Sequence, residues 1–104
     1  MDARGKFQTI WQYQVRDECI AQFKEVYAAD GDWAKLFSGV PGYVKTELIQ
    51  DCDHQNRFIT IDYWESREAF LNLRRKVGPR YRDLDIRTER LTVSEIHLGY
   101  FTEL

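Results

Sequence analysis

Residues 58–66, in the middle of the chain, constrain its fold more than any other segment. They read Phe-Ile-Thr-Ile-Asp-Tyr-Trp-Glu-Ser. Successive side chains of a strand point to opposite faces of the sheet. One face would carry Phe58, Thr60, Asp62 and Trp64, and the other Ile59, Ile61 and Tyr63. Both faces are largely apolar, so this strand needs other elements packed on its two sides.

A single carboxylate, that of Asp62, lies inside this apolar segment. Burying an unpaired charge costs free energy and shifts the pKa of the group. Two interpretations stay open. In the first, Asp62 pairs with an arginine such as Arg74, and the aromatic residues are ordinary core. In the second, Asp62 performs chemistry in a pocket.

The periodicity of apolar residues predicts the elements on either side of this strand. We expect a single domain over residues 1–104. Its strands are predicted at 7–15, 43–51, 58–64 and 95–102, and its helices at 17–29, 32–37 and 66–77. Ser66 is the expected N-cap of the last helix. Gly78-Pro79 would interrupt that helix, with one or two further turns through Leu84 and an irregular passage to Leu91.

This order of elements is close to the split βαβ plan. It predicts an α+β fold of the ferredoxin-like kind, with a four-stranded antiparallel sheet and the helices on one face. The other face would carry Ile10, Ile59, Ile61 and Tyr63, which is too apolar for water. We therefore expect a homodimer in which two sheets pack face to face.

Composition restricts the partners. The 15 basic and 17 acidic residues give a net charge of -2, which predicts no attraction to nucleic acid. The segment after Met1 is polar and no stretch has the length of a membrane span, so we expect no membrane contact and a cytoplasmic location. Cys19 and Cys52 are too few and too isolated for a metal site, and we expect free, inert thiols.

Two further features are open to a functional or a structural interpretation. Arg74 belongs to a basic cluster at residues 74–82 that could hold an anionic ligand. The cluster could equally be a solvated helix face whose charge is compensated by the acids at 83, 85 and 89. His97, in the last predicted strand, is either a pocket residue or a satisfied structural histidine. On the ligand interpretation Arg74 and His97 are substrate-binding candidates.

The order of several short motifs resembles the antibiotic biosynthesis monooxygenase-like domains of the dimeric α+β barrel superfamily. The resemblance covers nearly the whole chain. It rests on Asp30-Gly31-Asp32-Trp33 with Leu36-Phe37, Pro41-Gly42-Tyr43 before Thr46-Glu47-Leu48, Asp62-Tyr63-Trp64-Glu65-Ser66, and Leu91-Thr92 with Glu95 and Gly99. Members of this superfamily include quinol and anthrone oxygenases, haem-degrading enzymes and proteins of unknown role, so the resemblance indicates fold more than activity.

The resemblance implies a pocket between sheet and helices, lined by the inward faces of strands 7–15 and 58–64. Cofactor-free oxygenases of this kind remove a proton from a phenol or quinol, and the resulting anion reduces dioxygen directly. On that analogy Asp62 is the candidate base, Tyr13 the hydrogen-bond partner, and Trp11 and Trp64 the surfaces on which a planar substrate stacks. The alternative is a non-catalytic dimeric module that binds a small molecule or another protein.

The haem-degrading branch fits this sequence poorly. Its members resemble one another in an inward Asn on the first strand, a Trp before the helix and a His on the helix. Trp64 matches the tryptophan, but Tyr13 stands in the Asn position and residues 66–77 contain no histidine. No nucleotide-binding loop, zinc spacing or nucleophile elbow is present in the sequence. We therefore expect no cofactor and no metal.

Overall fold

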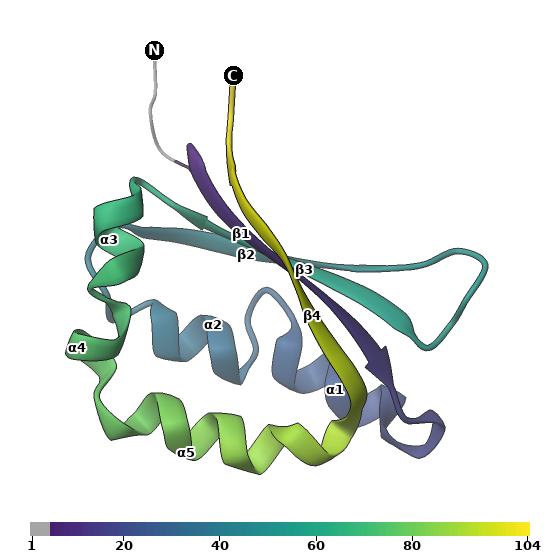
Figure 1. Ribbon diagram of the computed structural model, residues 1–104. Coiled ribbons are helices and arrows are strands. Elements are labelled where there is room, and N and C mark those ends of the chain that lie inside the picture. The colour runs from purple at the N-terminus through teal and green to yellow at the C-terminus, as the bar shows by residue number, and fades with distance from the viewer. Residues whose placement is uncertain (1–4) are drawn as a thin grey trace.

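The computed structural model describes residues 5–104. It contains an antiparallel sheet in the strand order β2-β3-β1-β4, with the helices beneath one face (Figure 1). The strands are β1 Phe7–Val15, β2 Tyr43–Gln50, β3 Arg57–Trp64 and β4 Thr92–Thr102. The helices are α1 Ile20–Tyr27, α2 Asp32–Phe37, α3 Arg67–Leu71, α4 Leu73–Val77 and α5 Pro79–Thr88, with short 3-10 turns at Asp17–Cys19 and Glu89–Leu91. This architecture confirms the predicted ferredoxin-like α+β fold.

β3 occupies the central position that its two apolar faces require. It pairs with β2 on one side and with β1 on the other. Phe58, Thr60, Asp62 and Trp64 are buried under the helices, and the residues between them are only half-buried. The register places Asp62 between Thr46 of β2 and Thr9 of β1. The strand therefore delivers its one carboxylate to the covered face of the sheet.

The helix that follows β3 begins as expected but is shorter. The Ser66 hydroxyl accepts a hydrogen bond from the Ala69 amide at 3.1 Å, which confirms the N-cap. The predicted helix over 66–77 is divided at Asn72 into α3 and α4. Gly78, at φ +56°, ends α4 in a conformation that glycine adopts without steric cost.

The segment after Gly78 departs most from expectation. Instead of one or two turns followed by an irregular passage, α5 runs for ten residues and β4 begins at Thr92. Pro79 is pre-organised for the first helical position. A stripe of polar side chains at Tyr81, Asp85 and Glu89 faces the space under the sheet. Because that stripe is polar, the helix lacks the apolar periodicity that would have predicted its length.

A β-bulge in β4 changes which side chains share a face. Gly99 pairs with Ile10 and His97 pairs with Trp11, so Leu98 has no partner across the ladder. Regular alternation over the predicted strand 95–102 would put His97 and Tyr100 on opposite faces, and the bulge makes this expectation wrong. Their rings lie 4.6 Å apart on the helix-covered face.

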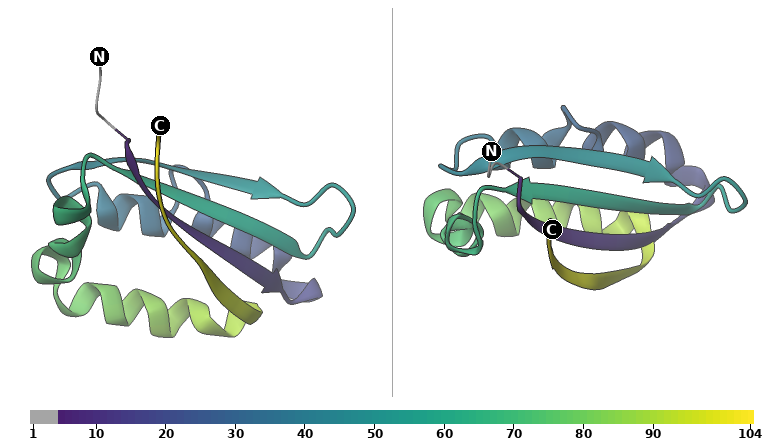
Figure 2. Two further views of the ribbon diagram at one scale, coloured as in Figure 1. Left: turned by 45° about the horizontal axis from the view of Figure 1, so that its top comes forward. Right: turned by 90° about the horizontal axis from the view of Figure 1, so that it is seen from above.

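Within residues 5–104 no helix covers the second face of the sheet, and Figure 2 shows the helices on the other side. It carries half-buried Ile10, Ile59, Ile61 and Tyr63, as predicted from the sequence. Across residues 5–104 the structure has no helix long and apolar enough to cross a membrane. Both cysteines are free, with Cys19 buried and Cys52 exposed at the β2–β3 hairpin.

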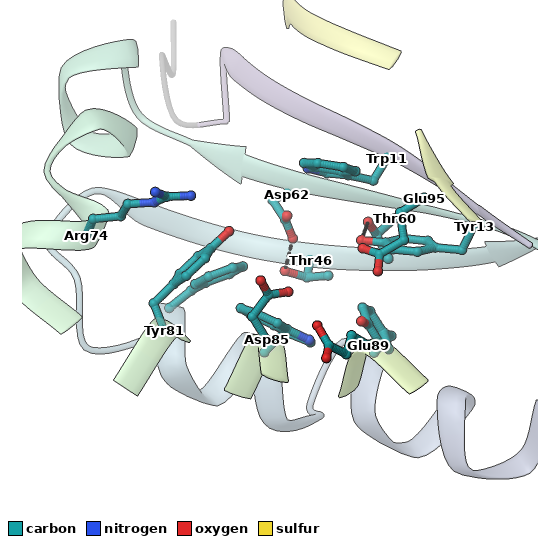
Figure 3. A pocket seen from close by; sticks show the side chains of 13 residues that line it. Trp11, Tyr13, Thr46, Thr60, Asp62, Arg74, Tyr81, Asp85, Glu89 and Glu95 are labelled. Carbon is teal, nitrogen blue, oxygen red and sulfur yellow. Dashed lines mark hydrogen bonds between the residues drawn. The ribbon is translucent and has the colours of Figure 1, made fainter. Parts of the chain in front are cut away.

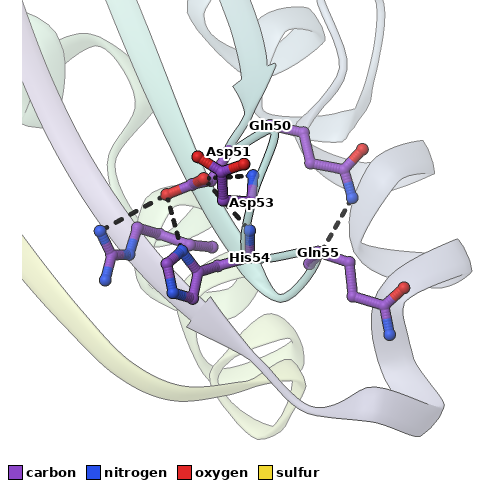
Figure 4. A network of polar contacts seen from close by, with 6 residues as sticks. Gln50, Asp51, Asp53, His54 and Gln55 are labelled. Carbon is purple, nitrogen blue, oxygen red and sulfur yellow. Dashed lines mark hydrogen bonds and ion pairs between the residues drawn. The ribbon is translucent and has the colours of Figure 1, made fainter.

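That hairpin is closed by polar contacts around Asp51 (Figure 4). The Asp51 carboxylate accepts hydrogen bonds from the amides of Asp53 and His54 and lies 3.4 Å from the Arg57 guanidinium. His54 therefore has a structural place in the turn. The network orders the connection between β2 and β3, far from the covered face.

Candidate functional site

A cavity lies between the covered face of the sheet and the helices (Figure 3). It has two adjoining lobes of about 300 and 270 Å³, which share Trp11, Phe37, Asp62, Arg74 and Tyr81. The first, here called the acidic lobe, is also lined by Tyr13, Tyr27, Trp33, Thr46, Thr60, Asp85, Glu89 and Glu95. The second, the histidine lobe, is also lined by Thr9, Trp64, Phe70, Leu71, Leu73, His97 and Tyr100. All six residues proposed from the sequence line one lobe or both.

Asp62 lies where the two lobes meet, with 8% of its surface exposed. Its Oδ1 accepts a hydrogen bond of 2.6 Å from the Thr46 hydroxyl, which in turn lies 2.7 Å from the hydroxyl of Tyr43. Within residues 5–104 no hydrogen bond reaches Oδ2 of Asp62. That oxygen is free to accept a proton from a molecule in the cavity.

Burial controls the protonation of Asp62. Loss of solvation raises its pKa from 3.8 to about 6, and the hydrogen bond from Thr46 opposes the rise. No ion pair joins Asp62 to an arginine among the described residues. Arg74 instead lies over the ring of Tyr81, with its guanidinium carbon 4.9 Å from the ring centroid. The pairing of Asp62 with Arg74, one of the two interpretations from the sequence, is therefore not what the structure shows.

Tyr13 points from β1 into the acidic lobe and belongs to the aromatic core. Its hydroxyl accepts a hydrogen bond of 3.4 Å from Thr60, and its ring packs against Phe23 and Tyr27. Burial raises the pKa of Tyr13 well above its ordinary value of 10.0, and the charges nearby add to the rise. Tyr13 is thus a neutral phenol over the whole physiological pH range, able to donate a hydrogen bond but not to act as a base.

Trp11 and Trp64 differ in how deeply they are buried. Trp11 is half-buried and contributes to both lobes, with its ring 4.8 Å from that of His97. Trp64 is fully buried at 0% exposure, and Phe37, Tyr43 and Phe70 surround it. Trp11 therefore offers an accessible aromatic wall, whereas Trp64 forms part of the floor of the histidine lobe.

His97 is both a cavity residue and a satisfied one. Its Nε2 lies 3.1 Å from the Thr9 hydroxyl, and its ring is held between Trp11 and Tyr100. The bulge at Leu98 turns Tyr100 to this side, where it closes the histidine lobe beside Phe70. The two sequence interpretations of His97 are therefore compatible.

Sequence reasoning missed the acidic residues that α5, the 3-10 turn after it and β4 contribute. It treats Asp85 and Glu89 as surface charges that compensate the basic cluster, and Glu95 as the start of a strand and part of a family motif. Tyr81, Asp85 and Glu89 follow one another at intervals of four residues, the spacing of one helix face, and all three line the acidic lobe. That spacing was the available signal. Across residues 5–104 no three His, Cys, Asp or Glu side chains are placed to hold a metal ion.

The family model for antibiotic biosynthesis monooxygenase (ABM) matches residues 8–77, about two thirds of the chain. The match includes the segments that supply Trp11, Tyr13, Asp62, Trp64 and Arg74. The chain belongs to this family, as the sequence motifs indicated. No curated protein matches the chain.

Three solved structures share the fold of this chain over nearly their full length. SnoaB, a cofactor-independent oxygenase from Streptomyces nogalater, is 25% identical, with a TM-score of 0.76 over 96% of this chain and 94% of SnoaB. A point mutant of SnoaB gives a TM-score of 0.79 at 23% identity, over 95% and 93% of the two chains. Rv0793 from Mycobacterium tuberculosis is 14% identical, with a TM-score of 0.68 over 94% of each chain.

Proposed function

We propose that this protein is a cofactor-independent monooxygenase that acts on a small hydroxylated aromatic of the quinol or anthrone type. One observation carries the proposal: Asp62 is a buried carboxylate with a pKa of about 6 and an open Oδ2 at the centre of an aromatic cavity. Family membership and the likeness to SnoaB, a cofactor-independent oxygenase, support the same class of reaction.

In this mechanism Asp62 takes a proton from the substrate. A carboxylate with a raised pKa is a stronger base than an exposed one and is still ionised at neutral pH. The resulting carbanion or phenolate has a high-energy electron pair and passes electrons to dioxygen directly. For an anthrone, the ring CH₂ becomes C=O, one oxygen atom enters the product and the other leaves as water.

The other cavity residues would bind and orient the substrate. Trp11 offers a flat wall for a planar ring, and the neutral phenol of Tyr13 can donate a hydrogen bond to an oxygen substituent. Arg74 provides positive charge that favours the anion formed on proton removal. Trp64 and His97 would shape the histidine lobe, where the remainder of the substrate would lie.

Oxygen uptake tests this function. A panel of quinols and anthrones is supplied to the purified protein and dioxygen consumption is recorded with an electrode. We expect at least one compound to be turned over, Asp62→Asn to lower kcat by about 100-fold or more, and turnover to fall as pH drops below about 6, where Asp62 is protonated. Asp83→Asn, on α5 but outside the cavity, is the control.

Two outcomes contradict the mechanism. If Asp62→Asn keeps the rate of the unchanged protein, Asp62 is not the base. If compounds bind in the cavity but none consumes dioxygen, the chain is a small-molecule-binding module, the second function that the sequence left open.

We also propose that the chain is a homodimer through the open face of the sheet. The support is the set of half-buried apolar side chains on a face that no helix covers. Sedimentation equilibrium at micromolar concentration measures the mass, and a mass of one chain contradicts the proposal.

A further inference from the structure

The charges that line the cavity are unequal. Four carboxylates line the acidic lobe, those of Asp62, Asp85, Glu89 and Glu95. Within residues 5–104, Arg74 is the only arginine or lysine that lines either lobe, and it lies over Tyr81. No ion pair reaches any of the four carboxylates in the part of the chain that the structure describes.

These charges are separated along the cavity. Figure 3 shows Arg74 and Tyr81 at one end, and Glu89 and Glu95 at the other, beside Tyr13. Asp85 comes from α5 and faces the sheet below Asp62. A ligand that spans the acidic lobe thus meets one positive end and one strongly negative end.

The carboxylates influence one another. Partial burial raises the pKa of Glu95, its hydrogen bond from Thr92 lowers it, and the negative charges of Asp85 and Glu89 raise it again. Among the four, Asp62 is more than nine-tenths buried, and within residues 5–104 no hydrogen bond reaches its Oδ2, which is open to the cavity. Asp85, Glu89 and Glu95 are exposed around the lobe, and carboxylates without a paired cation attract one.

The surroundings favour an organic cation. The acidic side chains are not grouped as metal ligands within residues 5–104. Aromatic rings of Tyr13, Tyr27 and Trp33 line the same lobe, and their faces attract ammonium groups. A ligand with an ammonium group attached to an aromatic ring can pair with the carboxylates and pack against the aromatic side chains.

We propose that the ligand is a phenol bearing a protonated amine, with its ring against Trp11, its hydroxyl at Asp62 and its ammonium group among Asp85, Glu89 and Glu95. The inference rests on the proposed function only for placing the reacting hydroxyl at Asp62. It narrows the substrate class from hydroxylated aromatics in general to those that carry positive charge. An anionic substituent at the acidic end would be repelled.

Three phenols of nearly equal size test the preference. Tyramine is positive, 4-ethylphenol is neutral and 3-(4-hydroxyphenyl)propionate is negative near pH 8, which is above the pKa of about 6 of Asp62. Isothermal titration calorimetry measures the Kd of each. We expect tyramine to bind about tenfold more tightly than 4-ethylphenol, and the propionate to bind most weakly.

Substitutions of the acidic residues show which of them cause the preference for tyramine. Glu89→Gln alone is expected to weaken tyramine binding by about threefold, since its side chain is exposed and partly screened. Asp85→Asn, Glu89→Gln and Glu95→Gln together should abolish the preference and leave the Kd of 4-ethylphenol within about twofold. Asp83→Asn, one of the acids outside the cavity, should change none of these values. Circular dichroism confirms that each variant is folded.

The result that overturns the proposal is an equal Kd for the three phenols, no measurable binding of any of them, or a tyramine preference that survives the triple variant. This outcome is distinct from failure of the oxygenase function. If tyramine is preferred but no compound consumes dioxygen, the charge preference stands and the reaction is wrong. If neutral quinols are oxidised without any amine preference, only the present inference fails.

Discussion

The two faces of the sheet differ in the hydrogen bonding and the pKa of their carboxylates. On the covered face, Asp62 has a single hydrogen bond and its pKa rises to about 6 because solvent is excluded. On the open face, Tyr63 donates a hydrogen bond of 2.6 Å to Glu47, and this bond lowers the pKa of Glu47. The carboxylates of Asp62 on β3 and Glu47 on β2 therefore have pKa values shifted in opposite directions. The covered face thus keeps a desolvated carboxylate with a raised pKa, whereas the open face pairs its carboxylate with a hydrogen-bond donor.

The largest expected effect concerns packing on the covered face. Trp64→Ala removes a fully buried indole from among three aromatic rings, and we expect the free energy of unfolding to fall by about 3–5 kcal/mol. Ile49→Ala, on the open face and 51% exposed, should cost less than about 1 kcal/mol. Urea unfolding measures both. Equal losses would mean that the two faces are equally packed.

The second prediction concerns the charge of Asp62. The pKa of Asp62 is raised in the folded state, so the folded chain binds more protons than the unfolded chain between pH 3.8 and about 6. The folded state therefore loses stability relative to the unfolded state as pH rises through that window. Asp62→Asn should therefore stabilise the fold at about pH 8 by about 2–3 kcal/mol and have little effect near pH 3.

Urea unfolding across this pH range measures the Asp62 effect. Thr46→Val is a useful counterpart, because losing the hydrogen bond to Oδ1 should raise the pKa of Asp62 further. An Asp62→Asn chain that is less stable at pH 8 would show that Asp62 is not the unfavourably buried charge described above.

The third prediction uses the open face. Ile61→Glu places a charge in the centre of the proposed dimer contact, and we expect the chain to sediment as a monomer with a loss of less than about 1 kcal/mol in its own folding. Ile86→Glu is the matched control, since Ile86 is 52% exposed on α5, away from the sheet. If Ile61→Glu remains dimeric, the contact lies elsewhere.

The smallest effect is expected at the polar pair of the open face. Tyr63→Phe removes the hydrogen bond to Glu47 at a partly exposed position and should cost about 0.5 kcal/mol. The pKa of Glu47 should then move up toward its ordinary value, which carboxylate NMR titration detects. An unchanged pKa would mean that the bond is not formed in solution.

Much of this comparison could be predicted from the sequence. The alternation within residues 58–64 separated the two faces of β3 correctly, because side-chain direction in a strand depends only on local geometry. Asp62 stood out for the same reason, as a charge among apolar neighbours. The four strands and the N-cap at Ser66 follow from equally local signals.

The cavity itself could not be predicted in full. Asp85 and Glu89 look like ordinary surface acids, and only the packing of α5 and the 3-10 turn after it under the sheet places them in the cavity of Asp62. The bulge at Leu98 similarly reverses the direction of Tyr100, and nothing in the local alternation marks it. Both depend on contacts between segments that are distant in the chain.

The sequence by itself determined the four strands and the first two helices, the family and the one carboxylate that the core would have to bury. Only the tertiary structure decided that Asp62 has Thr46, and not Arg74, as its partner, and that acids from α5 and β4 share its cavity. The physical reason is that patterns along a chain report which face a residue occupies. The partner of a buried charge depends instead on which distant side chains reach the same space.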